Sequence, residues 1–285
     1  MRLASFLRSG RPGYGVVSDT GVHPVSESMT TRFPDLRSAI TGGVAGALAD
    51  HCSADAIPLT DLTLLPPIPN PGRIVCAGLN YRKPDPVEGV AAPETSHVVL
   101  FSRFPDSLVG HGAELEMPLG DAAETFDFEA EIAAVIGKAG RNIPAEQALD
   151  HVFGYSAVNE GSVRGWLKHS VHAAKNFHAS GSWGPWITTA DEAGDVATMR
   201  VESYVNGVQM QSATGSEMIF DLPSLIAYIS TIHPLEPGDV IATGSPDGVG
   251  GSRKPPVFLK PGDTVEIRVS GVGSLTNTVG PANRG

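Results

Sequence analysis

Apolar residues in this chain gather in short runs separated by glycine- and proline-rich turns, and few stretches show the 3.6-residue spacing of a long helix. Several runs are rich in β-branched residues, which favour strands. The Asn-Gly dipeptide at 206–207 favours a type I′ turn and predicts a hairpin over 199–210. Further strands are predicted at 73–79, 97–101, 126–137, 154–158, 186–189, 240–246 and 264–279. The pattern indicates a strand-dominated fold.

Helices are predicted as insertions between these strands. Residues 142–152 have a proline near the first turn, and Asp221 precedes an apolar stretch up to residue 229 as a helix cap. The polar stretch with His169 and His172 is predicted to be a loop. Helices inserted into a strand-rich chain indicate the α+β class.

Residues 1–65 are predicted to form a small N-terminal α/β module. Its predicted elements are strands at 14–17 and 21–25 and helical segments over 34–50. The proline-rich stretch at 64–72 is interpreted as a linker, because proline interrupts helices and is a poor strand former. Residues 66–285 then make up the β-dominated main domain.

The run at 126–137 (FDFEAEIAAVIG) carries three acidic residues at alternating positions. Because side chains alternate between the faces of a strand, Asp127, Glu129 and Glu131 are expected on one face, about 7 Å from one to the next. Three like charges repel one another unless a cation offsets them, and hard divalent ions prefer oxygen ligands. The pattern therefore predicts either a metal site or the solvated acidic face of an edge strand.

Composition and charge limit the class of protein. The 285-residue chain has a net charge of −11, which argues against nucleic acid or an anionic membrane as a partner. It has no 18-residue apolar run, and its first apolar segment is too short for a signal peptide. Two cysteines, Cys52 and Cys76, do not make a disulfide framework or a zinc site. We therefore expect a globular protein of the cytoplasm.

Several short motifs occur in order along the chain and together resemble the fumarylacetoacetate hydrolase family. Each motif alone is weak, and the resemblance is dense from Arg73 to Val279. The motifs are GLNYR at 78–82, FEAE at 128–131, VIGK at 135–138, GYS at 154–156, NE at 159–160, KNF at 175–177, GPW at 184–186, VNG at 205–207, Gln211, LEPGDVI at 235–241, TGSP at 243–246 and GVG at 248–250.

The resemblance implies a mixed β-roll/β-sandwich catalytic domain, in a homodimeric enzyme that binds Mg²⁺, Mn²⁺ or Ca²⁺. The implied metal ligands are Glu129, Glu131 and Glu160. The family more often has Asp at the third of these positions, and Glu keeps the carboxylate. Lys175 matches the family's active-site lysine, which would neutralise a developing enolate.

The resemblance also implies residues that contact substrate. Ser245 occupies the position of a family threonine, and Arg82 is expected to orient substrate with it. Arg103 falls where the family has a basic residue, and it is interpreted either as an anion contact or as a surface residue. The other implied substrate-binding residues are Tyr81, Gln211, Thr243 and Gly244.

The chain departs from the family in the predicted lid after Arg82. The family commonly carries a water-activating His–Glu pair there, and Pro84 and Val87 take its two positions. Glu88 lies one residue later and is interpreted either as a catalytic carboxylate or as an exposed one. Further along, Leu167 stands where the family often has a substrate-contacting Gln.

We therefore expect a divalent-metal-dependent enzyme that acts on a 1,3-dicarbonyl or 2-oxo acid through a metal-bound enolate. The metal would polarise both substrate oxygens as a Lewis acid. Hydrolytic carbon–carbon cleavage is the family default. Isomerase, decarboxylase, dehydratase or cyclase chemistry is the alternative, because these reactions pass through the same enolate. A catalytically silent member that only binds a ligand is a further alternative, since the water-activating pair is missing.

Overall fold

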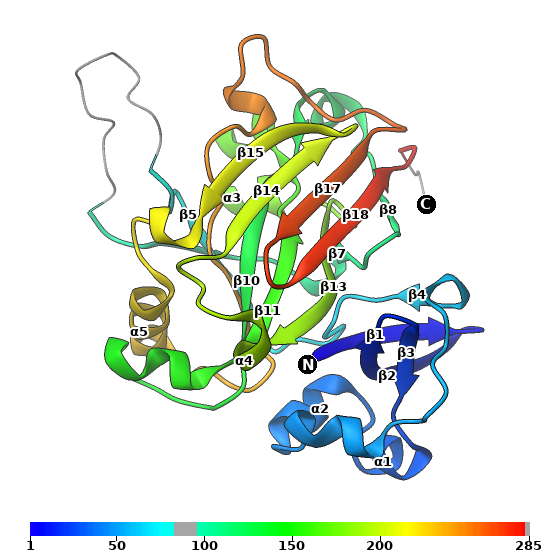
Figure 1. Ribbon diagram of the computed structural model, residues 1–285. Coiled ribbons are helices and arrows are strands. Elements are labelled where there is room, and N and C mark those ends of the chain that lie inside the picture. The colour runs from blue at the N-terminus through cyan, green and yellow to red at the C-terminus, as the bar shows by residue number, and fades with distance from the viewer. Residues whose placement is uncertain (83–95, 283–285) are drawn as a thin grey trace.

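The computed structural model describes residues 1–82 and 96–282, in which two large sheets face each other (Figure 1). The larger sheet has the order β3-β2-β1-β13-β11-β10-β16-β5-β6, with β4 paired to β1 and β7 paired to β13. Its strands are β1 (Arg2–Arg8), β2 (Arg11–Ser18), β3 (Gly21–Pro24), β4 (Thr63–Leu64), β5 (Ile74–Gly78), β6 (Val99–Ser102), β7 (Leu108–Val109), β10 (Ala130–Ile136), β11 (Val152–Asn159), β13 (Gly181–Thr189) and β16 (Val240–Ala242).

The second large sheet has the order β15-β14-β17-β18-β8, and β9 and β12 form a small separate pair. These strands are β8 (Glu114–Leu115), β9 (Phe126–Asp127), β12 (Ser162–Val163), β14 (Arg200–Val205), β15 (Val208–Thr214), β17 (Thr264–Val269) and β18 (Gly273–Val279). The predicted hairpin is confirmed as β14–β15, and both turn residues, Asn206 and Gly207, have the positive φ of a type I′ turn.

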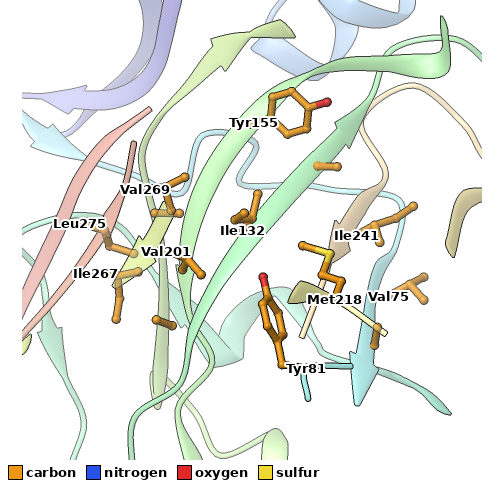
Figure 2. Packing of buried hydrophobic residues seen from close by; sticks show 14 of the residues in the cluster. Val75, Tyr81, Ile132, Tyr155, Val201, Met218, Ile241, Ile267, Val269 and Leu275 are labelled. Atoms are coloured by element: carbon orange, nitrogen blue, oxygen red, sulfur yellow. The ribbon is translucent and has the colours of Figure 1, made fainter. Parts of the chain in front are cut away.

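Much of the core lies between the two large sheets. Buried and more exposed residues alternate along β14 and β17, so each strand turns one face inward. Figure 2 shows Val201 and Ile267 from these strands together with Ile132 of β10 in the core, and all three belong to one buried cluster. The structure confirms the predicted α+β, strand-dominated class.

The helices are short. The predicted cap of α5 is confirmed, because Asp221 accepts a hydrogen bond from the Ser224 N–H at 2.9 Å. The stretch with His169 and His172, predicted to be a loop, contains α3, and the helix predicted over 142–152 is a 3-10 helix. The α-helices are α1 (Glu27–Arg32), α2 (Leu36–Thr41), α3 (Val171–Lys175), α4 (Ala190–Ala193) and α5 (Leu222–Ile232). The 3-10 helices are Ala45–His51, Leu59–Asp61, Pro105–Ser107, Gly120–Thr125, Ala145–His151, Arg164–Lys168, Gly215–Glu217 and Gly250–Ser252.

The N-terminal residues add strands to the larger sheet. β1, which the sequence pattern did not predict, pairs with β2 on one side and with β13 on the other, where Leu3 lies opposite Ile187. Leu3 and Tyr14 share one buried cluster with Val135 and Ile187. The first strands therefore continue the sheet of the main domain, and a domain division between residues 65 and 66 stays a prediction.

The acidic run at 126–137 forms two strands rather than the one predicted. β9 ends at Asp127 and β10 begins at Ala130, so Phe128 and Glu129 lie in a break. β10 lies between β11 and β16, and all seven of its residues are buried. The alternative of a solvated edge strand is therefore wrong.

Candidate active site

Polar side chains satisfy the backbone of the break between β9 and β10. The three consecutive N–H groups of residues 128–130 donate to the side chains of Asp127, Asn159 and Gln211, at 2.8, 3.1 and 3.0 Å respectively. These side-chain oxygens replace the carbonyl groups of a neighbouring strand as acceptors. The chain can therefore leave the sheet at this point without leaving a buried N–H group unpaired. The break ends the strict alternation of faces on which the sequence prediction relied.

Three carboxylates meet where β10 begins and β11 ends. In this antiparallel pair Ala130 lies opposite Asn159, and the Glu160 N–H donates to the Glu129 carbonyl oxygen at 2.8 Å. The register brings Glu129, Glu131 and Glu160 together, with one side-chain oxygen of each within 4.8 Å of the others. The three residues are 6, 1 and 1% exposed. Segments distant in the sequence thus form one buried acidic cluster.

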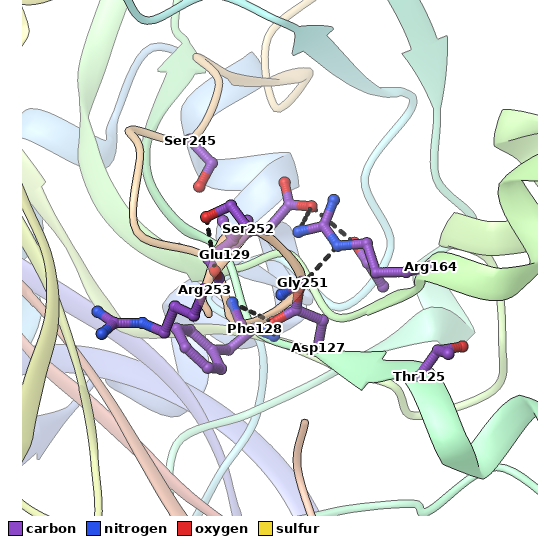
Figure 3. Close-up of polar contacts among 12 residues, drawn as sticks. Thr125, Asp127, Phe128, Glu129, Arg164, Ser245, Gly251, Ser252 and Arg253 are labelled. Atoms are coloured by element: carbon purple, nitrogen blue, oxygen red, sulfur yellow. Dashed lines mark hydrogen bonds and ion pairs between the residues drawn. The ribbon is translucent and has the colours of Figure 1, made fainter. Parts of the chain in front are cut away.

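Two cationic side chains contact this cluster. Lys175, the last residue of α3, donates from Nζ to Glu129 Oε1 at 2.8 Å and to Glu160 Oε2 at 2.6 Å. The Arg164 guanidinium lies beside Glu129, with Nη2 2.6 Å from Oε1 (Figure 3). Their positive charges offset part of the negative charge of the buried carboxylates.

These contacts set the protonation of the cluster. Burial opposes ionisation of Glu129, but Lys175 and Arg164 outweigh it and lower the pKa of Glu129 to about 2. Burial, followed by repulsion from Glu160 and Glu129, raises the pKa of Glu131 well above its ordinary value. Burial also disfavours the Lys175 ammonium, yet Glu129 and Glu160 raise the pKa of Lys175. The lysine therefore stays charged. Ionised Glu131 is the least stabilised of the three carboxylates, and a further cation beside it would favour its ionised form.

The chemistry of the cluster fits a hard divalent cation. Glu160 Oε1 is buried without a hydrogen-bond partner, so a carboxylate oxygen is available as a ligand. Carboxylate oxygens are the ligands that Mg²⁺, Mn²⁺ and Ca²⁺ favour. Glu129, Glu131 and Glu160 could hold such an ion together and still leave coordination positions for a chelating substrate.

Asp127 supports the site through Arg164 and a glycine-rich loop. Its Oδ2 accepts from Arg164 Nε at 2.7 Å and from the Gly251 N–H at 2.9 Å, and its Oδ1 accepts from the Gly250 N–H at 2.8 Å (Figure 3). A Cβ at Gly250 would lie 1.9 Å from the Val257 carbonyl oxygen, so the loop can approach this closely only with glycine. The loop thus holds Asp127, which orients Arg164.

The acidic cluster lies in a cavity of about 310 Å³, a size suited to a small molecule. The charged residues that line it are Glu129, Glu131, Glu160, Arg164, Lys175 and Asp247. Most of the other lining residues are apolar, among them Leu79, Val99, Phe101, Leu167, Val171 and Val249.

Two of the residues expected to bind substrate line this cavity, namely Ser245 and Tyr81. Gln211 lies behind Ser245 and donates from Nε2 to Ser245 Oγ at 2.8 Å and to the Pro246 carbonyl oxygen at 2.7 Å. Gln211 is 2% exposed and is not among the residues that line the cavity. It positions Ser245, whose contact with substrate stays a prediction.

Gly244 and Thr243 also lie behind the cavity wall. The Gly244 N–H donates to Glu131 Oε2 at 2.8 Å, and the Thr243 hydroxyl donates to the Ile132 carbonyl oxygen at 3.0 Å. Gly244 has a φ of 100°, a conformation that favours glycine. Both residues therefore hold the carboxylate of Glu131 and its strand in place, and their contact with substrate stays a prediction.

Arg103 is neither a surface residue nor part of the cavity wall. It is 3% exposed and donates to Gly161 carbonyl oxygen at 2.9 Å, to Ser107 Oγ at 3.0 Å and to Ser180 Oγ at 3.1 Å. These contacts hold the turn that follows Glu160 in place. The surface alternative is therefore wrong, and an anion contact of Arg103 stays a prediction.

The remaining candidates are at or beyond the edge of the described structure. Arg82 is exposed and is not among the described residues that line the cavity. Glu88 lies outside the described residues, as do Pro84 and Val87 at the positions of the family's His–Glu pair.

Sequence reasoning assigned no role to Arg164 or Ser162. Ser162 donates from Oγ to Glu129 Oε1 at 2.9 Å, on the same carboxylate oxygen that Lys175 and Arg164 contact. Both residues follow Glu160 closely in the sequence, and Arg164 also matches the pattern of the family. Their contact with Glu129 depends on the pairing of β12 with β9, which no local pattern reveals.

The comparisons with known proteins agree with this geometry. The family described as "Fumarylacetoacetate (FAA) hydrolase C-terminal" matches residues 73–280. The human mitochondrial oxaloacetate tautomerase FAHD2B is 34% identical to this chain over 277 residues, which cover 96% of this chain and 86% of that protein.

Solved structures of similar enzymes have the same fold. Fumarylacetoacetate hydrolase from psychrophilic Exiguobacterium antarcticum has a TM-score of 0.84 at 32% identity, over 99% of this chain and 100% of that one. Maleylpyruvate hydrolase from Sphingobium sp. SYK-6, solved with manganese(II) and pyruvate, has a TM-score of 0.79 at 28% identity over the same shares of the two chains. With a matched family model over most of its length and such relatives, this chain is an enzyme of the fumarylacetoacetate hydrolase family.

Proposed function

We propose that this enzyme is a tautomerase that interconverts the keto and enol forms of a 2-oxo acid. The observation that carries the proposal is the buried Lys175 ammonium, which faces the cavity next to three carboxylates. Tautomerisation moves a proton between carbon and oxygen and needs no attacking water. A relative at 34% identity along most of the chain bears the name oxaloacetate tautomerase, which supports this class of reaction.

We further propose that Glu129, Glu131 and Glu160 hold Mg²⁺, with Mn²⁺ and Ca²⁺ as alternatives. When bound, the ion would act as a Lewis acid on the two oxygens of the 2-oxo acid. The manganese in the similar maleylpyruvate hydrolase supports a divalent ion, while the choice of magnesium rests on the all-oxygen ligand set.

Lys175 is the proposed proton donor and acceptor at carbon C3 of the substrate. In the enol-to-keto direction Nζ gives its proton to C3, the enol hydroxyl loses its proton to solvent, and Nζ then regains a proton from solvent. The keto-to-enol direction runs the same three transfers in reverse. Glu129 and Glu160 hold Nζ in place at 2.8 and 2.6 Å. Ser245, positioned by Gln211, and Arg164, positioned by Asp127, are proposed to orient the substrate carboxylate.

Hydrolytic carbon–carbon cleavage is the second candidate, and the similar hydrolases from Exiguobacterium and Sphingobium favour it. Hydrolysis requires a base that activates water. Pro84 and Val87 at the expected positions carry no ionisable group, and the described residues that line the cavity include no histidine. These two facts favour tautomerisation over cleavage.

The test follows the ultraviolet absorbance of enol-oxaloacetate and enol-phenylpyruvate as they convert to the keto forms. We expect turnover that EDTA abolishes and Mg²⁺ or Mn²⁺ restores. Lys175→Met should lower kcat by about 100-fold or more, because general acid–base groups contribute on that scale. Lys168→Met is the matched control, since Lys168 is an exposed lysine outside the cavity lining.

Pyruvate release from acylpyruvates, measured in parallel, separates the alternatives. Cleavage without any acceleration of tautomerisation would refute the proposal in favour of a hydrolase. Stabilisation by Mg²⁺ with neither activity would instead indicate a silent ligand-binding member of the family.

The proposed partner is a small 2-oxo acid. No helix in the described part of the chain is both long and apolar enough to cross a membrane. The homodimer implied by the family resemblance stays a prediction that light scattering on the purified protein would check, and a cytoplasmic location likewise stays a prediction.

A further inference from the structure

The cavity wall divides into a charged floor and an apolar rim. Glu131 and Lys175 at the floor are 1 and 5% exposed. At the rim, Leu79, Leu167 and Val171 are 58, 41 and 40% exposed although all three line the cavity. They come from three separate segments: Leu79 directly follows β5, Leu167 lies in a 3-10 helix, and Val171 begins α3. The apolar rim is therefore a property of the cavity and not of one helix face.

We propose that this cavity selects 2-oxo acids whose substituent on C3 is uncharged and apolar, such as an aryl or branched alkyl group, over dicarboxylic 2-oxo acids. The inference rests on the proposed function, because it takes Lys175 as the group that meets C3. It assigns Leu79, Leu167 and Val171 as residues that determine specificity.

An apolar wall begins directly beside the proposed proton donor. Lys175 Nζ lies 5.3 Å from the centroid of the Phe101 ring. Phe101 and Val99 line the cavity from β6, and Val249 lines it from the glycine-rich loop. A substituent on C3 would therefore extend from the Lys175 ammonium over an apolar part of the cavity wall. An aryl or alkyl group is stabilised by burial there, whereas a carboxylate loses its hydration.

The charges of the lining residues also favour an uncharged substituent on C3. Four carboxylates line the cavity, namely Glu129, Glu131, Glu160 and Asp247, against the two cations Arg164 and Lys175. A bound divalent ion would bring these fixed charges into balance. No positive charge of the described lining residues is then left over for a second substrate carboxylate, whereas the first can chelate the ion.

Leu79 adds an independent observation. Its φ is 54°, in the left-handed region that is unfavourable for leucine and in which Gly or Asn costs less. Strained backbone conformations persist where the surrounding structure holds them, and they cluster at functional sites. Here the strain holds a leucine that is 58% exposed against the mouth of the cavity. We attribute this to contact with the apolar substituent of the substrate.

Enol-phenylpyruvate and enol-oxaloacetate make a matched pair of substrates, because they differ only in having a phenyl group or a carboxylate on C3. With the Mg²⁺-loaded enzyme, we expect kcat/KM for phenylpyruvate to exceed that for oxaloacetate by about tenfold or more. An equal or higher kcat/KM for oxaloacetate would overturn the inference and leave the proposed tautomerase function intact.

Leu167→Lys places a cation on the rim. We expect it to lower kcat/KM for phenylpyruvate and to raise it for oxaloacetate, so that their ratio falls by about tenfold or more. Leu149→Lys is the control, because Leu149 is similarly exposed at 45%, also lies in a 3-10 helix, and is not among the residues that line the cavity. An unchanged ratio in Leu167→Lys would show that the rim does not meet the substituent.

Leu79→Asn tests the strained position, since asparagine tolerates the same backbone conformation. We expect an unchanged or higher melting temperature together with a lower kcat/KM for phenylpyruvate and little change for oxaloacetate. An equal fall for both substrates would contradict a role in specificity.

Calorimetric titration separates this inference from the proposed function. Phenylpyruvate and oxaloacetate are titrated into the Mg²⁺-loaded wild type and into Lys175→Met. If the protein turns over neither acid, the tautomerase proposal fails. The ratio of the two dissociation constants still decides the inference: tighter binding of phenylpyruvate supports it, and equal or tighter binding of oxaloacetate refutes it.

Discussion

Asp127 shows how one buried carboxylate can organise a site without entering the cavity. It accepts four hydrogen bonds, from Phe128 N, Gly250 N, Gly251 N and Arg164 Nε. The sequence pattern placed Asp127 with the two glutamates as one acidic face. The structure separates it from them, because its own contact with Phe128 N helps to end β9.

Replacement of Asp127 by Asn is expected to destabilise the protein by about 3 kcal/mol, because an amide NH₂ would then face backbone or guanidinium donors inside the protein. Urea unfolding measures this loss. Arg164 would also lose its orientation, so we expect a fall of about 10- to 100-fold in kcat/KM. Asp19→Asn is the control, since Asp19 makes only an exposed ion pair with Arg2. A loss no larger than that of the control would contradict the assignment of Asp127 as an anchor.

His111 is expected to make the stability of the protein depend on pH. Its Nδ1 accepts a hydrogen bond from the Thr276 N–H at 3.1 Å, and burial lowers the pKa of His111 below its usual value of 6.5. The folded state therefore binds fewer protons than the unfolded chain between the lowered pKa and about 6.5. Its contribution to stability is complete above that range and is lost as the pH falls through it.

We expect His111→Asn to remove this part of the acid destabilisation, because the Asn side-chain oxygen can accept from Thr276 without titrating. The free energy of unfolding, measured between pH 5 and pH 8, should fall less on acidification in the variant than in the wild type. His178→Asn, which changes an exposed histidine, should keep the wild-type slope. A wild-type slope in His111→Asn would refute the assignment.

At the scale of elements, the β14–β15 hairpin depends on a turn whose conformation is set locally. Gly207 has a φ of 78°, and a Cβ there would meet no atom within 4 Å. Gly207→Ala should therefore destabilise the protein by about 1 kcal/mol through backbone strain alone. Gly46→Ala is the matched control, because that glycine also has open space around it but has no positive φ. Equal effects of the two substitutions on urea unfolding would contradict this explanation.

The same contrast explains which elements could be predicted. The Asn206-Gly207 turn, the Asp221 cap and the apolar run of β5 are specified by neighbouring residues, and all three are confirmed. The break at Phe128 and Glu129 was not predictable, because Asn159 and Gln211 supply the acceptors from distant strands. Strand β1 was not predicted, because its short apolar run becomes a strand through pairing with β2 and β13.

In the candidate site, too, features specified by local sequence were predictable and features that depend on distant contacts were not. Local motifs and the family resemblance identified Glu129, Glu131, Glu160 and Lys175, which the structure brings into contact or close approach. They could not distinguish a residue in the cavity wall from one behind it. Gln211 matches the family pattern, yet it contacts Ser245 from behind the cavity wall. Its position depends on the packing of β15 against the start of β10, which the sequence does not reveal.

At the scale of the whole molecule, the acidic site and the N-terminal strands are parts of one sheet. β1 pairs with β13, β13 with β11, and β11 with β10, at whose beginning the three carboxylates meet. The buried cluster that contains Leu3 extends to Val135 and Val158 on the strands of the site. Residues 1–65 and the main domain are therefore expected to unfold together.

We accordingly predict a single calorimetric transition for the whole chain. Leu3→Ala, at a fully buried position, should lower the stability of that one transition by about 3 kcal/mol. Mg²⁺ should raise the melting temperature of the same transition in both the wild type and the variant, because a ligand that binds the folded state stabilises everything that unfolds with its site. Val208→Ala, at a residue that is 63% exposed on β15, is the control and should change the transition little. Two transitions, of which Leu3→Ala shifts one and Mg²⁺ the other, would show instead that the N-terminal module folds independently of the site.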